Sequence, residues 1–79
     1  MTFRITPVPS DGPGVLRLAG SLGAREVPEL ERSAEAGVGA LDVSDLLSVD
    51  EEGVAALRRL RARGVEIRSP SRYLAMLLA

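Results

Sequence analysis

Glycine and proline divide this chain into short segments, and the hydrophobic period changes from one segment to the next. Residues 2–8 alternate, with Phe3 and Ile5 on one face, which is typical of a half-buried strand. A dense turn signal over 9–14 separates them from a second apolar segment at 15–20. We therefore predict that the chain begins with a β-hairpin.

The next segment changes to a helical period. Val27, Leu30 and Ala34 recur at helical spacing. Pro28 suits the first turn of a helix, and Gly37 suits the position after its last turn. These residues predict a first helix.

The second half of the chain repeats this alternation. We expect a short buried strand at 40–44 followed by a loop, and then a helix over 51–63 that ends at Gly64. A strand at 65–68 and a short final helix complete the chain. The apolar stripe of the longer helix comprises Val54, Leu57 and Leu60.

The predicted order is β-β-α-β-α-β-α in a single domain spanning residues 1–79. Alternating strands and helices favour an α/β fold with a small mixed sheet, its last three strands parallel and its helices packed on one face. Such a sheet leaves an edge open. The final helix has more apolar residues than one face needs, so we expect part of it to meet another chain. These residues are Tyr73, Leu74, Met76, Leu77 and Leu78.

Composition excludes several classes of function. The 79 residues include no Cys and no His, so disulfides, the commonest metal ligand and the commonest general base are all missing. All ten basic residues are Arg. Few groups remain for nucleophilic or acid–base chemistry, and we expect neither an enzyme nor a bound cofactor.

Charge and hydropathy point to a protein partner in the cytoplasm. The net charge of −1 produces no strong field toward nucleic acid or membranes. One Phe and one Tyr offer little for base stacking. No signal peptide is visible, and no stretch approaches the roughly 20 apolar residues of a membrane span.

Three consecutive acids, Asp50, Glu51 and Glu52, precede the second predicted helix. Carboxylates at a helix start interact favourably with the helix dipole, by about 0.3–1 kcal/mol each near the surface. Ser48 and Glu51 have capping-box spacing, and Asp50 is the alternative cap. A local structural role is therefore a sufficient explanation for the acids.

Two chemical alternatives for the acids are weaker. Together with Asp42 and Asp45 they could offer oxygen ligands to Mg²⁺ or Ca²⁺, but their spacing matches no calcium loop. Hydrolysis by paired carboxylates would need a second acid from elsewhere in the chain. We predict no metal site and no catalytic residue.

Residues 41–71, LDVSDLLSVDEEGVAALRRLRARGVEIRSPS, resemble the STAS domain family of anti-sigma factor antagonists and sulfate transporter C-terminal domains. Residues 42–44 take the positions of the family's D-L-S strand end, and 50–53 take those of its D-S-S-G helix start. Gly20 and Leu22 stand where the family has G-x-L. The resemblance implies a non-catalytic protein-binding fold that acts in the regulation of transcription in bacteria.

The resemblance also implies a phosphorylation switch that this chain lacks. In anti-sigma factor antagonists, the first Ser of D-S-S-G is phosphorylated by a kinase that is itself the anti-sigma factor, and the phosphate blocks docking. Here Glu51 replaces that Ser and Glu52 replaces the second one. Gly23 stands where the family commonly has Asp, and the chain stops in the third helix, before the family's last strand and helix. We expect a shortened STAS-like domain without phosphate control.

The predicted partner is another protein, either an anti-sigma factor of the kinase type or a subunit of a complex. The alternative is a structural or assembly subunit, which could be a homo-oligomer or an accessory piece of a transporter. Nothing singles out Ser44 or Ser48 for modification. The predicted docking residues are Asp50, Glu51, Glu52, Gly53, Val54 and Leu57, with Arg58 and Arg61 as secondary contacts.

Overall fold

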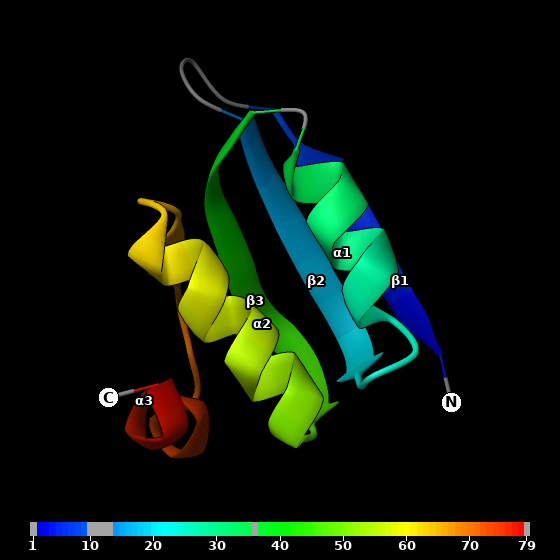
Figure 1. Ribbon diagram of the computed structural model, residues 1–79, viewed down its shortest axis with the longest axis vertical. Coiled ribbons are helices and arrows are strands. Elements are labelled where there is room, and N and C mark those ends of the chain that lie inside the picture. Colours follow the sequence, from blue (N-terminus) through cyan, green and yellow to red (C-terminus); the bar gives the residue numbers. More distant parts are fainter. Residues whose placement is uncertain (1, 10–13, 36, 79) are drawn as a thin grey trace.

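The computed structural model describes residues 2–9, 14–35 and 37–78. The order β-β-α-β-α-β-α predicted from the sequence is confirmed (Figure 1). The turn predicted between the first two strands falls mainly on 10–13, outside the described residues. The elements are β1 (Phe3–Val8), β2 (Gly14–Leu22), α1 (Val27–Ala34), β3 (Val38–Val49), α2 (Glu51–Ala62), β4 (Glu66–Arg68) and α3 (Arg72–Leu78).

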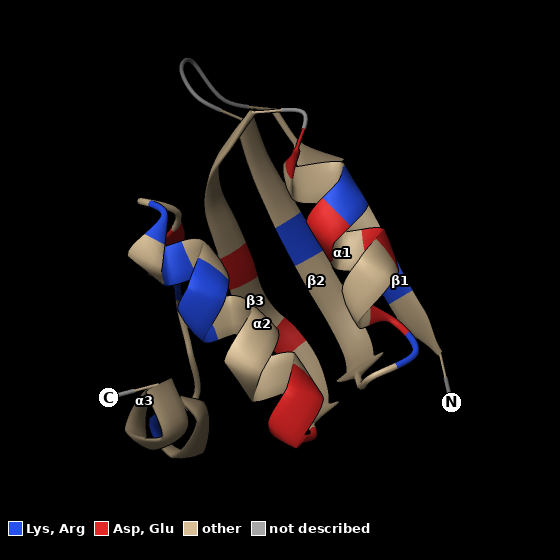
Figure 2. Ribbon diagram, viewed as in Figure 1, with Lys and Arg blue, Asp and Glu red and all other residues tan. Residues whose placement is uncertain are grey.

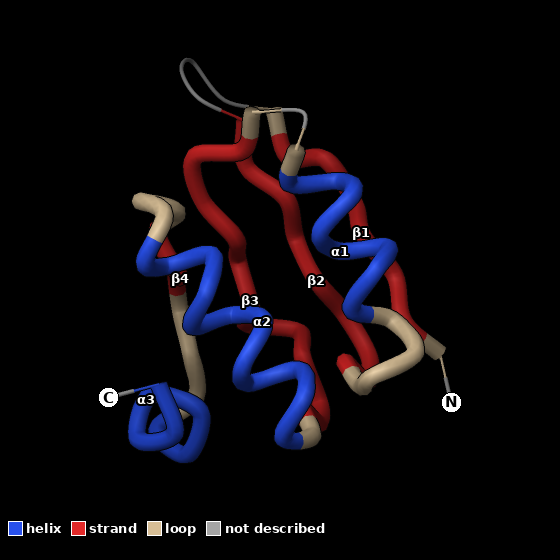
Figure 3. Tube along the Cα trace, in the orientation of Figure 1, coloured by secondary structure: helices blue, strands red, loops and turns tan. Residues whose placement is uncertain are grey.

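The sheet has four strands in the order β1-β2-β3-β4. β1 runs antiparallel to β2, whereas β2, β3 and β4 are parallel, as predicted. Helices α1 and α2 lie side by side on one face of this sheet, and α3 lies beside the lower half of α2 (Figures 1 and 3). The predicted small mixed sheet with helices on one face is confirmed.

The strand predicted at 40–44 is much longer than expected. β3 extends from Val38 to Val49 and pairs with β2 over that length, so the loop predicted after residue 44 is wrong. Between Asp42 and Asp45, β3 has one residue more than the paired part of β2. This register shift breaks the alternation of apolar and polar residues, which is why the sequence pattern ends early.

The same shift explains a local hydrogen bond. The carboxylate of Asp42 accepts a bond of 2.9 Å from the backbone N–H of Ser44, in the segment where the register changes. A second shift near the end of the strand leaves Leu47 as the extra residue between the positions paired with Gly20 and Ser21. The Leu47 side chain is 86% exposed.

One hydrophobic core joins the sheet to all three helices. Among the described residues, none with a polar or charged side chain is buried. Every buried leucine therefore packs against apolar neighbours, and the core depends on burial of apolar area. The fully or almost fully buried leucines are Leu18, Leu22, Leu30, Leu41, Leu57, Leu60, Leu74 and Leu78.

The helix ends follow the expected local chemistry. Gly64 adopts a φ of 100° directly after the cap residue Arg63, a left-handed conformation that favours glycine. α3 begins after Ser71, whose hydroxyl accepts a bond of 3.1 Å from the N–H of Leu74. No helix in the described part of the chain is long and apolar enough to cross a membrane.

Candidate docking site

The predicted site lies at the carboxyl ends of the parallel strands β2 and β3 (Figure 1). The chain passes from the last residue of β3 through Asp50 directly into α2. The connection from β2 to α1 lies at the same end of the sheet. Loops and helix starts at this end of a parallel sheet commonly form binding sites, because side chains from several connections converge there.

Asp50 hydrogen-bonds both to the start of α2 and to the β2–α1 connection. Its Oδ1 accepts a bond of 2.8 Å from the N–H of Gly53 and caps α2. Its Oδ2 accepts from the N–H of Ala24, at 3.2 Å, in the β2–α1 connection. Asp50 is therefore the cap of α2, and the hydroxyl of Ser48 instead donates to Ser21 at 2.8 Å.

Gly53 is required by close packing. A Cβ at this position would lie 2.5 Å from the carbonyl oxygen of Leu22 and 2.7 Å from Cγ1 of Val49. Neither contact is tolerable, and the first involves backbone that cannot easily move. The Asp and Gly that this segment shares with the D-S-S-G motif thus have structural roles: one caps the helix, and the other lets it approach β2.

The two residues between Asp50 and Gly53 are not constrained by packing. Glu51 and Glu52 are both exposed in the first turn of α2, where the backbone N–H groups favour negative charge. Figure 2 shows the acidic first turn of α2 and the basic residues that follow in its second half. The side chains at these two positions can change without disturbing the helix frame.

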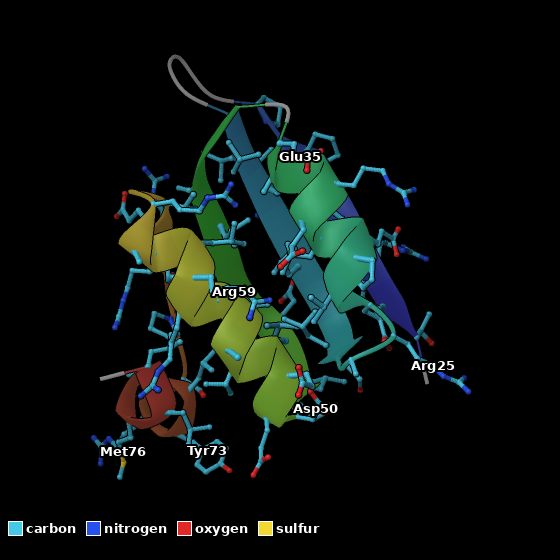
Figure 4. All side chains as sticks on the ribbon, in the orientation of Figure 1. Arg25, Glu35, Asp50, Arg59, Tyr73 and Met76 are labelled. Carbon is cyan, nitrogen blue, oxygen red and sulfur yellow. The ribbon has the colours of Figure 1, made fainter. Side chains whose placement is uncertain are left out.

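Glu51 lies on the wall of an open groove of about 530 Å³ between α2 and α3. Apolar and charged side chains both line it. Tyr73, which is 69% exposed, projects from α3 at the lower end of the molecule (Figure 4). We call this the docking groove, and it is lined by Val49, Asp50, Glu51, Val54, Ala55, Arg58, Arg59, Tyr73 and Leu77.

A smaller hollow of about 240 Å³ lies between the end of β3 and α3. It shares Val49, Tyr73 and Leu77 with the docking groove and has Leu47 on its rim. The two depressions therefore form a continuous surface around Tyr73. Exposed apolar side chains surrounded by charges are typical of protein interaction sites.

Three of the predicted docking residues do not line this surface. Glu52 is exposed in the first turn of α2 but lies outside both depressions, and the other two are buried. Gly53 is buried against β2, and Leu57 is fully buried in the core. Leu57 belongs to the core stripe of α2, so its side chain points away from any partner. Val54 is half-buried and lines the docking groove.

The arginines of α2 separate into different contacts. Arg58 lines the docking groove. Arg59 forms an ion pair of 2.7 Å with Glu31 of α1, and Arg61 donates to the carbonyl of Leu78 at the end of α3. Arg61, predicted as a secondary partner contact, is thus engaged within the fold, where its cation meets a helix C-terminus.

Sequence reasoning did not place Tyr73 and Leu77 in the site. The surplus of apolar residues in the final helix was the available signal, and the structure confirms that surplus because Tyr73 and Met76 are 69% and 71% exposed. What the sequence could not show is that α3 packs beside the start of α2. That arrangement depends on tertiary contacts of Leu74 and Leu78.

Gly23, at the position where the resembling family commonly has Asp, lies directly beside the cap. A Cβ there would be 3.0 Å from Oδ2 of Asp50 and 3.8 Å from Oε2 of Glu26. An acidic side chain at this position would add a third carboxylate to the two already present. Among the described residues, no group of three or more acidic side chains could hold a metal ion.

The pKa of the Asp42 carboxyl lies below its ordinary value. Hydrogen bonds from the backbone and side chain of Ser44 lower the pKa of this carboxyl, and the charge of Arg17 on β2, at 3.7 Å, adds to the effect. Asp42 lies outside the docking groove. Its role is to support the register shift of β3.

The fold is of the type found in an anti-sigma factor antagonist, namely the STAS fold. A solved structure of the anti-sigma factor antagonist SpoIIAA in its unphosphorylated form matches with a TM-score of 0.66. The match covers 96% of this chain and 80% of that one at 21% sequence identity. The resemblance predicted from the sequence is therefore confirmed at the level of the fold.

A second solved structure is similar but more distant. It is an uncharacterized protein of the DUF3478 family with a SpoIIAA-like fold from Shewanella loihica PV-4. It matches with a TM-score of 0.53 and 15% identity, over 90% of this chain and 69% of that one. Neither a scan of protein-family models nor a search of curated proteins finds a match for this sequence.

Proposed function

We propose that this protein is a non-catalytic docking module of the anti-sigma factor antagonist type, acting in the cytoplasm, in which Glu51 replaces the phospho-acceptor. One observation supports this above the others. Asp50 and Gly53 have the cap and close-packing roles that fix the helix start, while Glu51 stands exposed between them at the docking groove. The two residues that fix the helix start are therefore present, and a carboxylate stands in place of the acceptor hydroxyl.

A fixed carboxylate has a direct consequence for regulation. Phosphoserine has a charge of about −1.5 to −2 near neutral pH, and it can be removed by a phosphatase. A glutamate has one negative charge that no phosphatase removes. The proposed protein therefore docks in a single electrostatic state, and its partner tolerates or requires a negative charge at the start of α2.

The proposed partner is an anti-sigma factor of the kinase type. The immobilised protein is incubated with native lysate, and bound proteins are identified by mass spectrometry. We expect such a kinase to be captured, and Glu51→Arg to abolish its capture because the charge at the groove is reversed. Glu29→Arg, the same reversal in the first turn of α1, is the matched control and retains the partner. If Glu51→Arg leaves every specific partner bound, the site is wrong.

A gain of function tests the acceptor position separately. Glu51→Ser restores a hydroxyl in the frame fixed by Asp50 and Gly53. We expect the captured kinase to phosphorylate Glu51→Ser with ATP, and to leave the unmodified protein and Glu51→Gln unlabelled. Phosphate incorporation is measured by intact mass.

The assembly-subunit alternative has its own observation, the exposed Tyr73 and Met76 on α3. If a larger complex holds the protein by this helix, Tyr73→Ser with Met76→Ser releases the captured complex, whereas Glu51→Arg does not. The same capture experiment therefore distinguishes the two functions.

A further inference from the structure

The outer edge of β3 is covered for only part of its length. β4 pairs with residues 40–42, and β3 continues to Val49. Ser69, directly after β4, adopts a φ of 56°, and Pro70 has no N–H to donate to a neighbouring strand. The chain therefore leaves the sheet here and reaches α3 through a loop (Figure 3). Among the described residues, no strand pairs with residues 43–49 on this side.

Hydrogen bonds to β2 fix which backbone groups of this edge point outward. The N–H of Asp50 donates to the carbonyl of Leu22 at 3.1 Å, and Leu22 is paired with Val49. In a parallel ladder, a residue bonds to the residues before and after its partner, so the N–H and C=O of that partner point to the other side. Those of Val49 are therefore directed to the open edge. The same holds for Leu46, whose partner Gly20 is two residues before Leu22.

The hollow between β3 and α3 lies along this edge. Leu46 and Val49 line its strand side, and Leu74 and Leu77 of α3 line the other. Its volume of about 240 Å³ is below the roughly 300–1,000 Å³ that is usual for pockets of small organic ligands. The hollow suits an apolar side chain, and the strand beside it offers backbone groups that can bond to the same chain.

The open part of β3 lacks the protection that the two outer strands have. β1 has a charge at Arg4 and a proline at Pro7, and β4 is three residues long with a charge at each end. Short strands, charges and proline hinder other chains from pairing with a sheet edge. Residues 46–49, LLSV, have neither a charge nor a proline, and Leu47 is 86% exposed at the rim of the hollow. This part of the edge is therefore open to pairing.

We propose that an extended peptide segment of a partner protein adds to this edge as a further strand. An extended chain offers the N–H and C=O groups that complete a strand edge. The peptide backbone bonds to Leu46 and Val49, and one of its apolar side chains enters the hollow beside Leu47. Strand addition takes affinity from main-chain hydrogen bonds and selectivity from pockets for alternate side chains. The hollow does not include Glu51, so this site can be tested apart from the proposed docking function.

Synthetic peptides test the strand pairing. Random peptides of about nine residues, long enough for one strand, are displayed on phage and selected on the immobilised protein. Fluorescein-labelled copies of the enriched sequences are then measured by fluorescence anisotropy. We expect enriched peptides with alternating apolar residues. Methylation of single backbone nitrogens should weaken binding about tenfold at the alternate positions that bond to β3, and less than about threefold at the positions between them. This test needs no variant of the protein.

Leu47→Asp tests the hollow from the side of the protein. The side chain is exposed, so the core stays intact, and binding of the enriched peptide should weaken about tenfold. Met76→Asp is the matched control, because Met76 is 71% exposed on α3 and lines neither depression. It should bind the peptide within about twofold of the unmodified protein. Circular dichroism verifies the folded state, and Leu47→Ser replaces Leu47→Asp if the latter fails to fold.

Amide hydrogen exchange locates the bound peptide on the sheet. The N–H groups of Leu46 and Val49 should exchange about tenfold more slowly once the enriched peptide is bound. The N–H of Asp50 already donates to Leu22, so its exchange should stay unchanged. Equal slowing at all three positions would show a general stabilisation rather than a new strand.

Four outcomes would overturn strand addition: no enriched peptide, an effect of methylation that does not alternate, a Leu47→Asp protein that binds as well as Met76→Asp, or self-association of the protein alone through Leu47. The last would make a second copy the occupant. Glu51→Arg should bind the peptide like the unmodified protein. Peptide binding without capture through Glu51 refutes the docking function alone, and capture through Glu51 without peptide binding refutes strand addition alone.

Discussion

At the scale of single residues, the start of α2 separates positions that the fold requires from positions that it leaves open. Asp50 bonds to both Gly53 and Ala24, and Gly53 packs where no Cβ fits. These two residues serve the fold, and they stay necessary whether or not the residues between them accept phosphate. Glu51 and Glu52 have no such constraint, so they are the positions at which function can change without loss of structure.

Gly53→Ala tests the structural half of this argument. The added Cβ would meet the carbonyl of Leu22 at 2.5 Å, so α2 must shift away from β2. We expect a loss of about 1–3 kcal/mol in the free energy of unfolding, although alanine is the better helix former. Urea unfolding followed by circular dichroism gives the value. Glu52→Ala in the same turn is the control, and an equal loss there would show that the close approach is not the cause.

Asp42 makes the free energy of unfolding depend on pH in acidic solution. Its pKa lies below the ordinary value of 3.8 in the folded state, because Ser44 and Arg17 favour the charged form. A group whose pKa is lowered by folding contributes stability that is present above its unfolded pKa and is lost as pH falls through the folded pKa. We therefore expect stability to fall below about pH 4, and Asp42→Asn to make that fall shallower.

The measurement compares urea midpoints of the two proteins between neutral pH and pH 2. Asn at position 42 retains an oxygen that can accept from Ser44, so the register shift of β3 is preserved. Asp45→Asn, the same substitution on the same strand, is the control. If the urea midpoints of all three proteins fall by the same amount as the pH is lowered, Asp42 is not the cause of the loss of stability in acid.

At the scale of elements, α2 connects the two parts of the proposed surface. Its Arg61 holds the carboxyl end of α3 through the carbonyl of Leu78, which keeps Tyr73 beside Val54 and the docking groove. A cation at a helix C-terminus is favourable because the last carbonyl groups lack partners within the helix. The bond from Arg61 therefore adds to the core contacts of Leu74 and Leu78 that hold α3 in place, and with it the shape of the groove.

Arg61→Ala should loosen α3 without unfolding the sheet. We expect a loss of about 1 kcal/mol, typical for one hydrogen bond that is only partly buried. Amide exchange should become faster in α3 and stay unchanged in β2 and β3. Arg63→Ala, an exposed arginine at the end of the same helix, serves as control. Equal exchange rates in Arg61→Ala and Arg63→Ala would contradict the role given to Arg61.

The elements also show what the sequence could and could not predict. Element order and the parallel strands follow from hydrophobic period and glycine positions, because these are local signals. The second half of β3 was missed, since the register shifts around Asp42 and Leu47 break the period of two on which strand prediction depends. The groove was missed because Tyr73 and Val54 meet only after α3 packs on the core.

Two of the predicted site residues illustrate a further limit. The motif placed Gly53 and Leu57 in the same stretch as Glu51, and a linear motif cannot tell which side of the helix faces a partner. The helical period could have done so, since Leu57 lies on the same stripe as the buried Leu60. Glu51, Val54 and Arg58 remain at the surface, and they are the predicted residues that line the docking groove with Asp50.

At the scale of the whole molecule, the fold depends on a single small core. The sheet, α1, α2 and α3 all contribute to one cluster of buried apolar residues, and the chain has no disulfide to support it. A domain of this size buries only about 60% of the surface of its unfolded chain, so the loss of any part of the core affects the whole. Helix α3 belongs to that cooperative unit through Leu74 and Leu78.

The single tyrosine makes this cooperativity measurable. Tyr73 lies on α3 and the chain has no Trp, so tyrosine fluorescence reports on α3, while far-ultraviolet circular dichroism reports on all elements. We expect both signals to follow one urea transition. Leu74→Ala should move both midpoints together, with a loss of about 2–4 kcal/mol for a buried leucine, whereas Met76→Ala on the exposed side of α3 should move neither. A fluorescence transition that precedes the circular dichroism transition would mean that α3 detaches first. The docking groove would then open before the fold is lost, and α3 would be an appendage rather than part of the core.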